Sequence, residues 1–283
     1  MADDEKKYVL LGANGMLGQA MQQLLGRRNL SYSLLTRPSF DLTRPETLGT
    51  AVLAGTNVVL NCAAYTDVDG AEADVEKADE INGYGVELLA NRCKEVGATL
   101  VHFSTDYVFA GDLNRPYLTS DSRAPINAYG RSKLIGELAI ENSGVDFLLI
   151  RTSWVYAPWG KNFVKTMAGL ARTKNHLKVV DDQIGRPTQA FALAENTLAL
   201  LEKNARGTFH LCDGGSCSWF EFAKHIVGAI NPDCEVSPCA SSEFPRPARR
   251  PPYGVLDLHK AEELIGKVTP WPEALDKVLE LIG

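Results

Sequence analysis

Apolar segments of strand length alternate with segments of helical periodicity through the first half of the chain. Short apolar runs predict strands at Tyr8–Leu11, Tyr32–Leu35, Val58–Asn61, Thr99–Ser104 and Phe147–Arg151. Apolar residues at helical spacing predict a helix that contains Leu17, Ala20, Met21, Leu24 and Leu25, and further helices over Pro45–Ala54, Ala78–Val96 and Ala128–Glu141. This alternation predicts an α/β fold with a doubly wound parallel sheet (Rossmann-like) and right-handed crossovers.

After about Trp154 the pattern changes. Helical periodicity continues at Asn162–Arg172, Ala190–Lys203, Trp219–Ile230 and Leu258–Ile265. Short strands are expected between these helices, at Lys178–Val180 and Thr208–Leu211, and proline and glycine cluster over Ser237–Gly254. We therefore expect residues 1–155 to form the main domain. Residues 156–283 should form mainly a smaller C-terminal lobe that binds substrate, with some segments returning to the main domain.

Composition excludes several classes of protein. A length of 283 residues with 45% hydrophobic and 23% charged residues suits a globular α/β unit with a lobe, and not a disordered chain. The net charge of −6 argues against a nucleic-acid partner, and no apolar run approaches the roughly 18 residues of a membrane span. The charged N-terminus is unlike a signal peptide, and the six cysteines show no CxxC pairing. We expect a cytoplasmic protein with reduced cysteines.

A glycine-rich turn joins the first strand to the first helix. Gly12, Gly15 and Gly18 occupy the position that a dinucleotide-binding loop requires. Gly12 permits a tight turn, Gly15 lets the backbone approach a pyrophosphate, and Gly18 lets helix and sheet pack closely. The helix N-terminus would direct N–H groups at the phosphates. The spacing GxxGxxG departs from the standard GxGxxG, but its place in the alternating chain favours a dinucleotide site over a purely structural turn.

The end of the second strand bears on the choice of cofactor. An NAD-specific site carries Asp or Glu about 20 residues after the glycine loop, where it binds the ribose 2′-hydroxyl. This chain has Thr36 and Arg37 there, and a guanidinium suits a 2′-phosphate. NADPH is therefore expected, acceptance of NADH is left open, and a solvated surface position is the alternative for Arg37. Asp41 is expected at the adenine end.

A phenol and an ammonium group share one face of a predicted helix. Tyr129 and Lys133 stand at i and i+4. A neighbouring ammonium lowers the pKa of a phenol from about 10 and makes it a better proton donor. Thr105 follows the fourth strand, at the sheet edge where open α/β folds bind ligands, and its hydroxyl can polarise a carbonyl. The three side chains favour carbonyl reduction over the alternative, an exposed helix pair.

These motifs resemble those of the extended short-chain dehydrogenase/reductase family. The shared residues are Gly12, Gly15, Gly18, Asn61-Cys62-Ala63-Ala64, Thr105, Tyr129 and Lys133. More narrowly, the chain is similar to the dTDP-4-dehydrorhamnose reductases in the segments Ser104–Phe109, Arg151–Tyr156, Asn162–Met167, Asp182–Thr188 and Ala248–Pro251. The resemblance extends from about Tyr8 to the C-terminus. It implies reduction of the 4-keto group of dTDP-4-dehydro-L-rhamnose to dTDP-L-rhamnose with NADPH or NADH.

The resemblance also implies roles for individual residues. Tyr129 is expected to donate the proton, Lys133 to lower the tyrosine pKa and hold the nicotinamide ribose, and Thr105 to bond the substrate oxygen. The expected cofactor contacts are Gly12, Asn14, Gly15, Met16, Leu17, Gly18, Arg37, Asp41, Leu42, Ala63, Ala64, Tyr65, Thr66, Tyr129 and Lys133. The expected substrate contacts are Thr105, Asp106, Trp154, Asn162, Arg249 and Arg250, the last three at the nucleotide diphosphate. A core position for Trp154 and a solvated loop for the arginines are the alternatives.

No metal is expected. Some relatives are described as magnesium-bridged dimers whose glutamates begin just after the third glycine, but Gln19–Gln22 contains no carboxylate. The segment Asp67–Gly70 lacks the remaining ligands of a calcium loop. Monomer and homodimer both remain open.

Three other functions compete with reduction. A nucleotide-sugar dehydratase resembles this chain but carries Asp-Glu after the threonine, where this sequence has Asp106-Tyr107. A 4-epimerase shares the tyrosine and lysine, and only the narrower motifs around Trp154 and Arg250 disfavour it. The regulatory beta subunit of methionine adenosyltransferase also resembles these reductases and binds NADP without catalysis. We expect that subunit to lack the tryptophan of Thr152-Ser153-Trp154.

Overall fold

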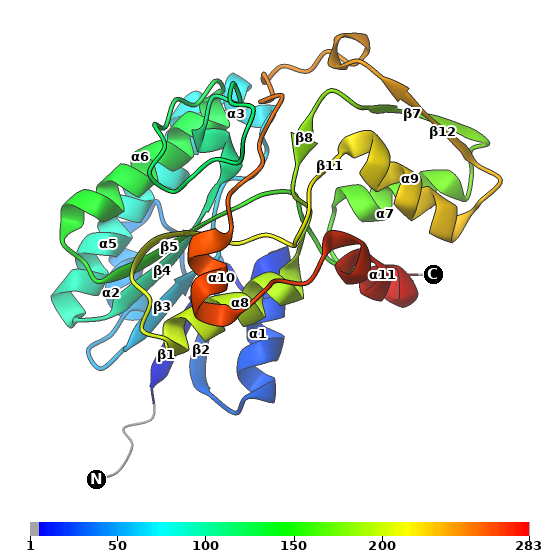
Figure 1. The fold of residues 1–283 in the computed structure, drawn as a ribbon. Coiled ribbons are helices and arrows are strands. Elements are labelled where there is room, and N and C mark those ends of the chain that lie inside the picture. Colours follow the sequence, from blue (N-terminus) through cyan, green and yellow to red (C-terminus); the bar gives the residue numbers. More distant parts are fainter. Residues whose placement is uncertain (1–5, 283) are drawn as a thin grey trace.

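A six-stranded parallel sheet forms the centre of the larger part of the molecule (Figure 1). The computed structural model describes residues 6–282. The argument against a signal peptide partly rests on residues 1–5, which lie outside the described residues. The strand order is β10-β5-β4-β3-β1-β2. The bounds are β1 Lys7–Leu11, β2 Ser31–Leu35, β3 Val58–Asn61, β4 Thr99–Thr105, β5 Phe147–Thr152 and β10 Gly207–His210. The predicted doubly wound parallel sheet is confirmed.

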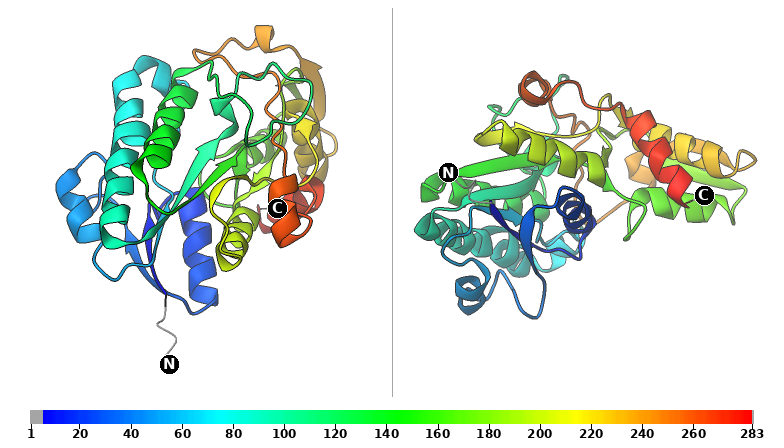
Figure 2. Two further views of the ribbon diagram at one scale, coloured as in Figure 1. Left: turned by 60° about the vertical axis from the view of Figure 1, so that its left-hand side comes forward. Right: turned by 90° about the horizontal axis from the view of Figure 1, so that it is seen from below.

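Helices cover both faces of this sheet (Figures 1 and 2). One face carries α1 (Met16–Arg27), α8 (Ala190–Glu202) and α10 (His259–Ile265), and the other carries α2 (Pro45–Ala51), α5 (Gly85–Val96) and α6 (Ala128–Ser143). Successive strand residues point to opposite faces. Leu10 and Leu60 therefore pack in the core beside α1 and α8, whereas Val9 and Val59 pack in the core beside α2 and α5. Burial on both faces explains why the strands read as continuous apolar runs.

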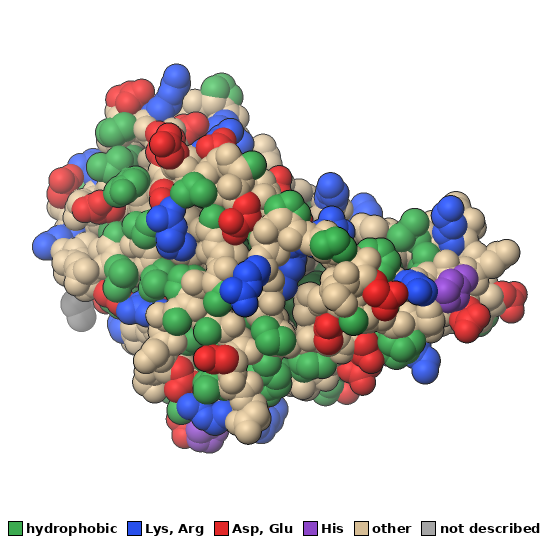
Figure 3. Space-filling model, turned by 90° about the horizontal axis from the view of Figure 1, so that it is seen from above, with side chains coloured by type: hydrophobic (Ala, Val, Ile, Leu, Met, Phe, Trp, Pro, Cys, Tyr) green, Lys and Arg blue, Asp and Glu red, His purple; other side chains and the backbone are tan. Residues whose placement is uncertain are grey.

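A smaller lobe extends from one side of the sheet (Figure 2). It contains α7 (Phe163–Ala171), α9 (Trp219–Ile230) and α11 (Trp271–Ile282) around a core rich in aromatic residues. Paired short strands complete it: β6 Val155–Tyr156 with β9 Thr188–Gln189, β7 His176–Val180 with β12 Glu235–Cys239, and β8 Ile184–Gly185 with β11 Cys217–Ser218. On the face seen in Figure 3, acidic and basic side chains are intermingled over both parts.

Some elements differ from the prediction. The expected helix Pro45–Ala54 ends at Ala51, because Val52 is already in an extended conformation. The helix expected over Ala78–Val96 begins earlier, as α4 (Val75–Asp79), and passes through a π-helical turn, η1 (Glu80–Tyr84), before α5. Helix α11 was not predicted, although its buried residues Ala274, Leu275, Val278 and Leu279 have helical spacing. The remaining short elements are α3 Gly70–Ala73, η2 Asp106–Val108 and η3 Ser241–Glu243.

Candidate functional site

The glycine turn between β1 and α1 is shaped by close approach of the backbone. Gly12 has φ +74°, and a Cβ there would lie 2.6 Å from the backbone nitrogen of Ala63, at the end of β3. A Cβ on Gly18 would collide with the carbonyl oxygen of Gly12, so α1 packs against the turn only because both residues are glycine. A Cβ on Gly15 would meet only this same carbonyl oxygen, at 3.4 Å, which leaves its other side open.

A cavity of about 390 Å³ opens beside this turn. Eight of the predicted cofactor contacts line it: Gly12, Asn14, Gly15, Arg37, Asp41, Leu42, Ala63 and Ala64. Four lining residues were not among the predicted contacts: Thr36, Phe40, Cys62 and Ile81. Thr36 and Cys62 directly adjoin predicted contacts, whereas Phe40 and Ile81 carry no polar signal in the sequence and reach the cavity only through the fold.

Charges of both signs stand at one end of the cavity. Arg37 is exposed, and its guanidinium helps to keep the pKa of Asp41 low. Partial burial acts to raise that pKa, but hydrogen bonds from Thr43 outweigh it, and Arg44 adds to the lowering. Asp41 is therefore held as a carboxylate beside Arg37. The predicted glycine-loop contacts Met16, Leu17 and Gly18, and the predicted contacts Tyr65 and Thr66 after β3, lie outside the set that lines the cavity.

Tyr129, Thr105 and Asp106 meet where β4 ends against the start of α6. The Thr105 hydroxyl donates to Asp106 Oδ1 at 2.9 Å and accepts from the backbone N–H of Tyr107 at 3.1 Å. The ring of Tyr107 meets the ring of Tyr129 edge-on, with centroids 6.0 Å apart. Asn127 begins α6 by accepting from the backbone N–H of Gly130 at 2.7 Å, which fixes the first turn that carries Tyr129.

The pKa values of this group follow from burial. Burial, and next the charge of Asp106, raises the pKa of Tyr129 well above its ordinary value, and the Thr105 hydroxyl offsets this in part. Burial also raises the pKa of Asp106 to about 7, against hydrogen bonds from Thr105 and from backbone N–H groups. Lys133 is not among the groups that shift the pKa of Tyr129 here, because the lysine has another partner, and its effect on the tyrosine stays a prediction.

That partner is His102, on β4. The Nζ atom of Lys133 lies 3.1 Å from His102 Nε2, and the other ring nitrogen, Nδ1, accepts from Asn61 Nδ2 at 3.0 Å. All three side chains are buried. Burial lowers the pKa of Lys133 to about 8, opposed by the charge of Glu137. Burial and the adjacent lysine lower the pKa of His102 far below its ordinary value. Sequence analysis did not identify His102, whose setting in an apolar strand gives no local signal.

Asn82, on the π-helical turn η1, is a second residue that sequence analysis missed. Its side chain accepts from the backbone N–H of Tyr65 and donates to the backbone oxygen of Tyr65, each at 2.9 Å. It also donates to the Ser132 hydroxyl at 3.0 Å. Asn82 thereby ties the loop after β3 to the helix that carries Tyr129 and Lys133. Gly83 and Gly85, inside a helical pattern, were the available signal for a special backbone there.

A buried ion pair fixes α6 against β5. Glu137 accepts from Arg151 Nε at 2.9 Å and Nη2 at 2.7 Å, and also from Arg123 at 2.9 Å. Burial acts to raise the pKa of Glu137, but the bonds from Arg151 outweigh it and keep the carboxylate ionised. Arg151 Nη1 also donates to the carbonyl oxygen of Thr119 at 3.2 Å. Helix α6 is therefore anchored one turn beyond Lys133.

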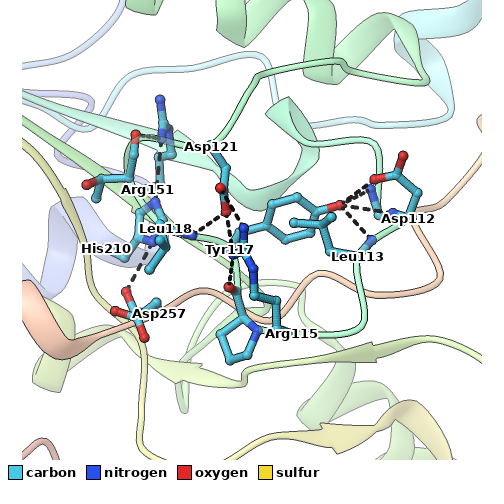
Figure 4. A network of polar contacts seen from close by, with 12 residues as sticks. Asp112, Leu113, Arg115, Tyr117, Leu118, Asp121, Arg151, His210 and Asp257 are labelled. Atoms are coloured by element: carbon cyan, nitrogen blue, oxygen red, sulfur yellow. Dashed lines mark hydrogen bonds and ion pairs between the residues drawn. The ribbon is translucent and has the colours of Figure 1, made fainter.

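The loop that follows η2 is held by a network of its own (Figure 4). The Tyr117 hydroxyl accepts from the backbone N–H of Gly111 and Asp112 and donates to the Asp112 carboxylate, over 2.8–3.0 Å. Arg115 forms a two-pronged pair with Asp121, and both distances lie between 2.8 and 2.9 Å. These contacts order the chain just beyond Thr105 and Asp106. The same segment pairs with the C-terminal loop, residues 244–258, through a bridge between Tyr117 and Leu256.

Two predicted substrate contacts, Trp154 and Asn162, take part in packing. The indole of Trp154 stacks on that of Trp219, with centroids 3.5 Å apart and planes 14° apart. Its backbone has φ +47°, an uncommon conformation for a residue other than glycine. Asn162 caps α7: its Oδ1 accepts from the Lys165 N–H, and its Nδ2 donates to the carbonyl oxygens of Ala157 and Trp159. Both amide hydrogens of Asn162 are thus occupied by protein partners, and its diphosphate contact stays a prediction.

Arg250 is likewise committed to a protein partner. It donates to both carboxylate oxygens of Asp69, at 2.7 and 2.9 Å, and to the carbonyl oxygen of Ala248 at 2.6 Å. The predicted diphosphate contact of Arg250 conflicts with this pairing, which instead ties the C-terminal loop to the loop after β3. Arg249 is exposed, and its contact stays a prediction. Among residues 6–282, His, Cys, Asp and Glu side chains form no group of three or more that could hold a metal ion.

The fold and these side chains define the class. A glycine turn against the end of β3, a tyrosine and a lysine one turn apart on α6, and a threonine closing β4 occur together in the short-chain dehydrogenases/reductases, as the sequence motifs imply. The family described as "RmlD substrate binding domain" matches residues 6–282. A dTDP-4-dehydrorhamnose reductase of Burkholderia thailandensis is 40% identical, over 93% of this chain and 94% of its own.

Solved structures agree with this comparison. A dTDP-4-dehydrorhamnose reductase from Clostridium acetobutylicum is 39% identical, with a TM-score of 0.93 over 98% of this chain and 99% of the other. The enzyme of the same name from Bacillus anthracis, solved in complex with NADP, is 35% identical, with a TM-score of 0.92 over 98% and 99%. The chain belongs to the dTDP-4-dehydrorhamnose reductase family. No helix in residues 6–282 is long and apolar enough to cross a membrane.

Proposed function

We propose that this protein is an oxidoreductase that uses NADPH to reduce the 4-keto group of dTDP-4-dehydro-L-rhamnose, giving dTDP-L-rhamnose. The observation that carries the proposal is the place of Tyr129 and Thr105. Thr105 ends β4, which neighbours β3 at the cavity beside the glycine turn, and Tyr129 lies next to Thr105 from the first turn of α6. Family membership supplies the nucleotide sugar as the substrate class, and the relatives named above are reductases of this kind.

The residues of the cavity fit NADPH. Gly12 and Gly18 leave a turn that a Cβ would fill, and Gly15 faces the open side, where a diphosphate can approach the helix N-terminus. Arg37 would bind the 2′-phosphate, and Asp41 and Leu42 would lie at the adenine end. Ala63, Ala64, Tyr65 and Thr66 would adjoin the nicotinamide half. When bound, NADPH supplies the hydride that reduces the carbonyl carbon.

The chain's own residues supply the proton and the polarisation of the carbonyl. A phenol has a pKa of about 10, so Tyr129 carries its proton at neutral pH and can give it to the oxygen of the reduced carbonyl. The Thr105 hydroxyl would bond the same oxygen. Asp106, already bonded to Thr105, would orient this hydroxyl or bind a sugar hydroxyl. Trp154 and Arg249 would contact the sugar nucleotide.

A single incubation tests the proposal. The purified protein is mixed with dTDP-4-dehydro-L-rhamnose and NADPH, and loss of the near-ultraviolet absorbance of the reduced nicotinamide is followed together with formation of dTDP-L-rhamnose. Equimolar consumption of NADPH and formation of product is expected. A second incubation with dTDP-glucose alone should give no dehydrated product. Tight NADP binding without turnover of the keto sugar would favour the regulatory-subunit alternative instead.

We also propose the cytoplasm as the site of the reaction. All six cysteines are free, and five of them are buried. Free thiols are typical of proteins that work in a reducing compartment.

A further inference from the structure

Three buried side chains form a row that ends at Lys133. Asn61 on β3 and His102 on β4 are register partners in the sheet, and Lys133 reaches the histidine from α6. Each of the three side chains is 1% exposed, so their polar atoms form hydrogen bonds with one another and not with water. Lys133 is expected from the family resemblance to hold the nicotinamide ribose, but no role has been assigned to the other two residues.

The direction of each hydrogen bond in this row can be worked out from one fixed point. The backbone N–H of Ala63 is a donor, and it bonds Asn61 Oδ1 at 3.1 Å. The other amide atom of Asn61, Nδ2, is therefore the one that faces His102, and it donates to Nδ1. With Nδ1 accepting, the neutral imidazole carries its hydrogen on Nε2. That hydrogen points at Lys133 Nζ, 3.1 Å away, and only an uncharged amine has a lone pair to accept it.

We propose that His102 is a positioning residue that holds Lys133 as an uncharged amine in the free enzyme at mildly alkaline pH, and that NADPH binding there is accompanied by uptake of one proton by this amine. The proton comes from the solvent and adds to the lone pair of Nζ, so that the ammonium can no longer accept from His102. It then serves the bound cofactor as a cation. This inference rests on the proposed function, because it takes NADPH as the ligand.

The charged and titratable groups around Lys133 are consistent with this assignment. On α6 itself, Glu137 favours the ammonium, but its carboxylate is neutralised by Arg151 from β5 and by Arg123. The remaining groups on packed elements are Tyr129 on α6, Asp106 after β4, Cys62 after β3, and Asp79 on α4, which pairs with Arg131. Burial raises the pKa of Cys62 and Tyr129 beyond the range in which they could supply the proton exchange.

The expected linkage has a defined sign. Burial lowers the pKa of Lys133 to about 8 in the free enzyme. In the complex, the negative charges of NADPH should raise the pKa of Lys133 again. NADPH should then bind about tenfold more weakly at about pH 9 than at about pH 7, with close to one proton taken up at the higher pH. Proton uptake is measured by titration calorimetry with NADPH in two buffers of different ionisation enthalpy.

Two variants separate the lysine from other sources of protons. In His102→Gln the amide can turn its oxygen to Lys133 and accept from an ammonium, so proton uptake and the pH dependence of the NADPH dissociation constant should both be lost. Asp106→Asn is the matched control, since Asp106 also titrates near neutral pH, and it should keep both. Circular dichroism of each variant reports whether the fold is retained, and Lys133→Met, with no amine, should show no uptake.

Each outcome of the calorimetric experiment either supports or overturns the inference. Uptake in the wild type and in Asp106→Asn, but not in His102→Gln, supports the inference. NADPH binding at about pH 9 without proton uptake in the wild type overturns the inference and leaves the proposed function intact, as does uptake that disappears with Asp106 and not with His102. If NADPH does not bind at any pH, the proposed function itself fails, and this inference fails with it.

Discussion

The buried carboxyl group of Asp106 should lower the stability of the protein at neutral and alkaline pH. Asp106 is 4% exposed, and burial raises its pKa to about 7. In the unfolded chain an aspartate has a pKa of about 3.9. Between these two values the folded state binds a proton that the unfolded state has released. Stability is therefore greatest on the acid side of this interval and is lost as the pH rises from about 4 to about 7.

The magnitude follows from the same interval. Each pH unit over which the folded and unfolded states differ by one proton contributes about 1.4 kcal/mol, so the interval of roughly three units gives on the order of 4 kcal/mol at about pH 8. Asp106→Asn keeps an oxygen that can accept from Thr105 and removes the charge. The variant should therefore be more stable than the wild type at about pH 8. At about pH 5 the difference should shrink to about 1.5 kcal/mol.

Urea unfolding at the two pH values measures this difference. Asp233→Asn, at an exposed position of the lobe, controls for the loss of one negative charge. Activity should fall in Asp106→Asn while stability rises, because residues at reaction centres are often retained at a cost in stability. A variant that is no more stable than the wild type at about pH 8, or a difference that is the same at both pH values, would refute the reasoning.

Three further substitutions test the proposed site. Tyr129→Phe removes the proton donor and should lower kcat by about 10²–10⁴ with little change in NADPH affinity, and a wild-type kcat would exclude this role. Arg37→Ala should lower the preference for NADPH over NADH, measured as the ratio of the two kcat/KM values, by about five- to thirtyfold. The reason is that a partly solvated charge-assisted bond contributes about 1–2 kcal/mol. An unchanged ratio would show that Arg37 does not bind the 2′-phosphate. Gly18→Ala forces a Cβ onto the Gly12 carbonyl and should destabilise the protein by about 1–3 kcal/mol and weaken NADPH binding. Gly49→Ala, with nothing within 4 Å of its Cβ, should do neither; equal behaviour of the two in thermal melts would contradict the steric argument.

Contacts between distant segments account for most differences between prediction and structure. Arg250 was assigned to a diphosphate from the resemblance to the reductases, yet Asp69 lies 181 residues away in sequence and pairs with it. The role of Lys133 depends on His102, and a histidine inside an apolar strand looks like any core residue until its neighbours are known. Asn162 is different, because an asparagine just before an apolar helical run is itself a capping signal. Its role as the N-cap of α7 could have been predicted from the local sequence.

The sequence by itself determined the α/β class, the strand and helix positions of the main sheet, the glycine turn and the reductase family. Local sequence patterns encode these features: apolar runs that are buried on both faces of the sheet, glycines where two backbone segments approach closely, and motif residues a few positions apart. Only the tertiary structure decided that β10 joins the main sheet next to β5, that Asp106 and Tyr129 are buried together, and that Lys133 faces His102. Burial and through-space pairing fix these charges and hydrogen bonds, and both depend on which segments the fold brings side by side.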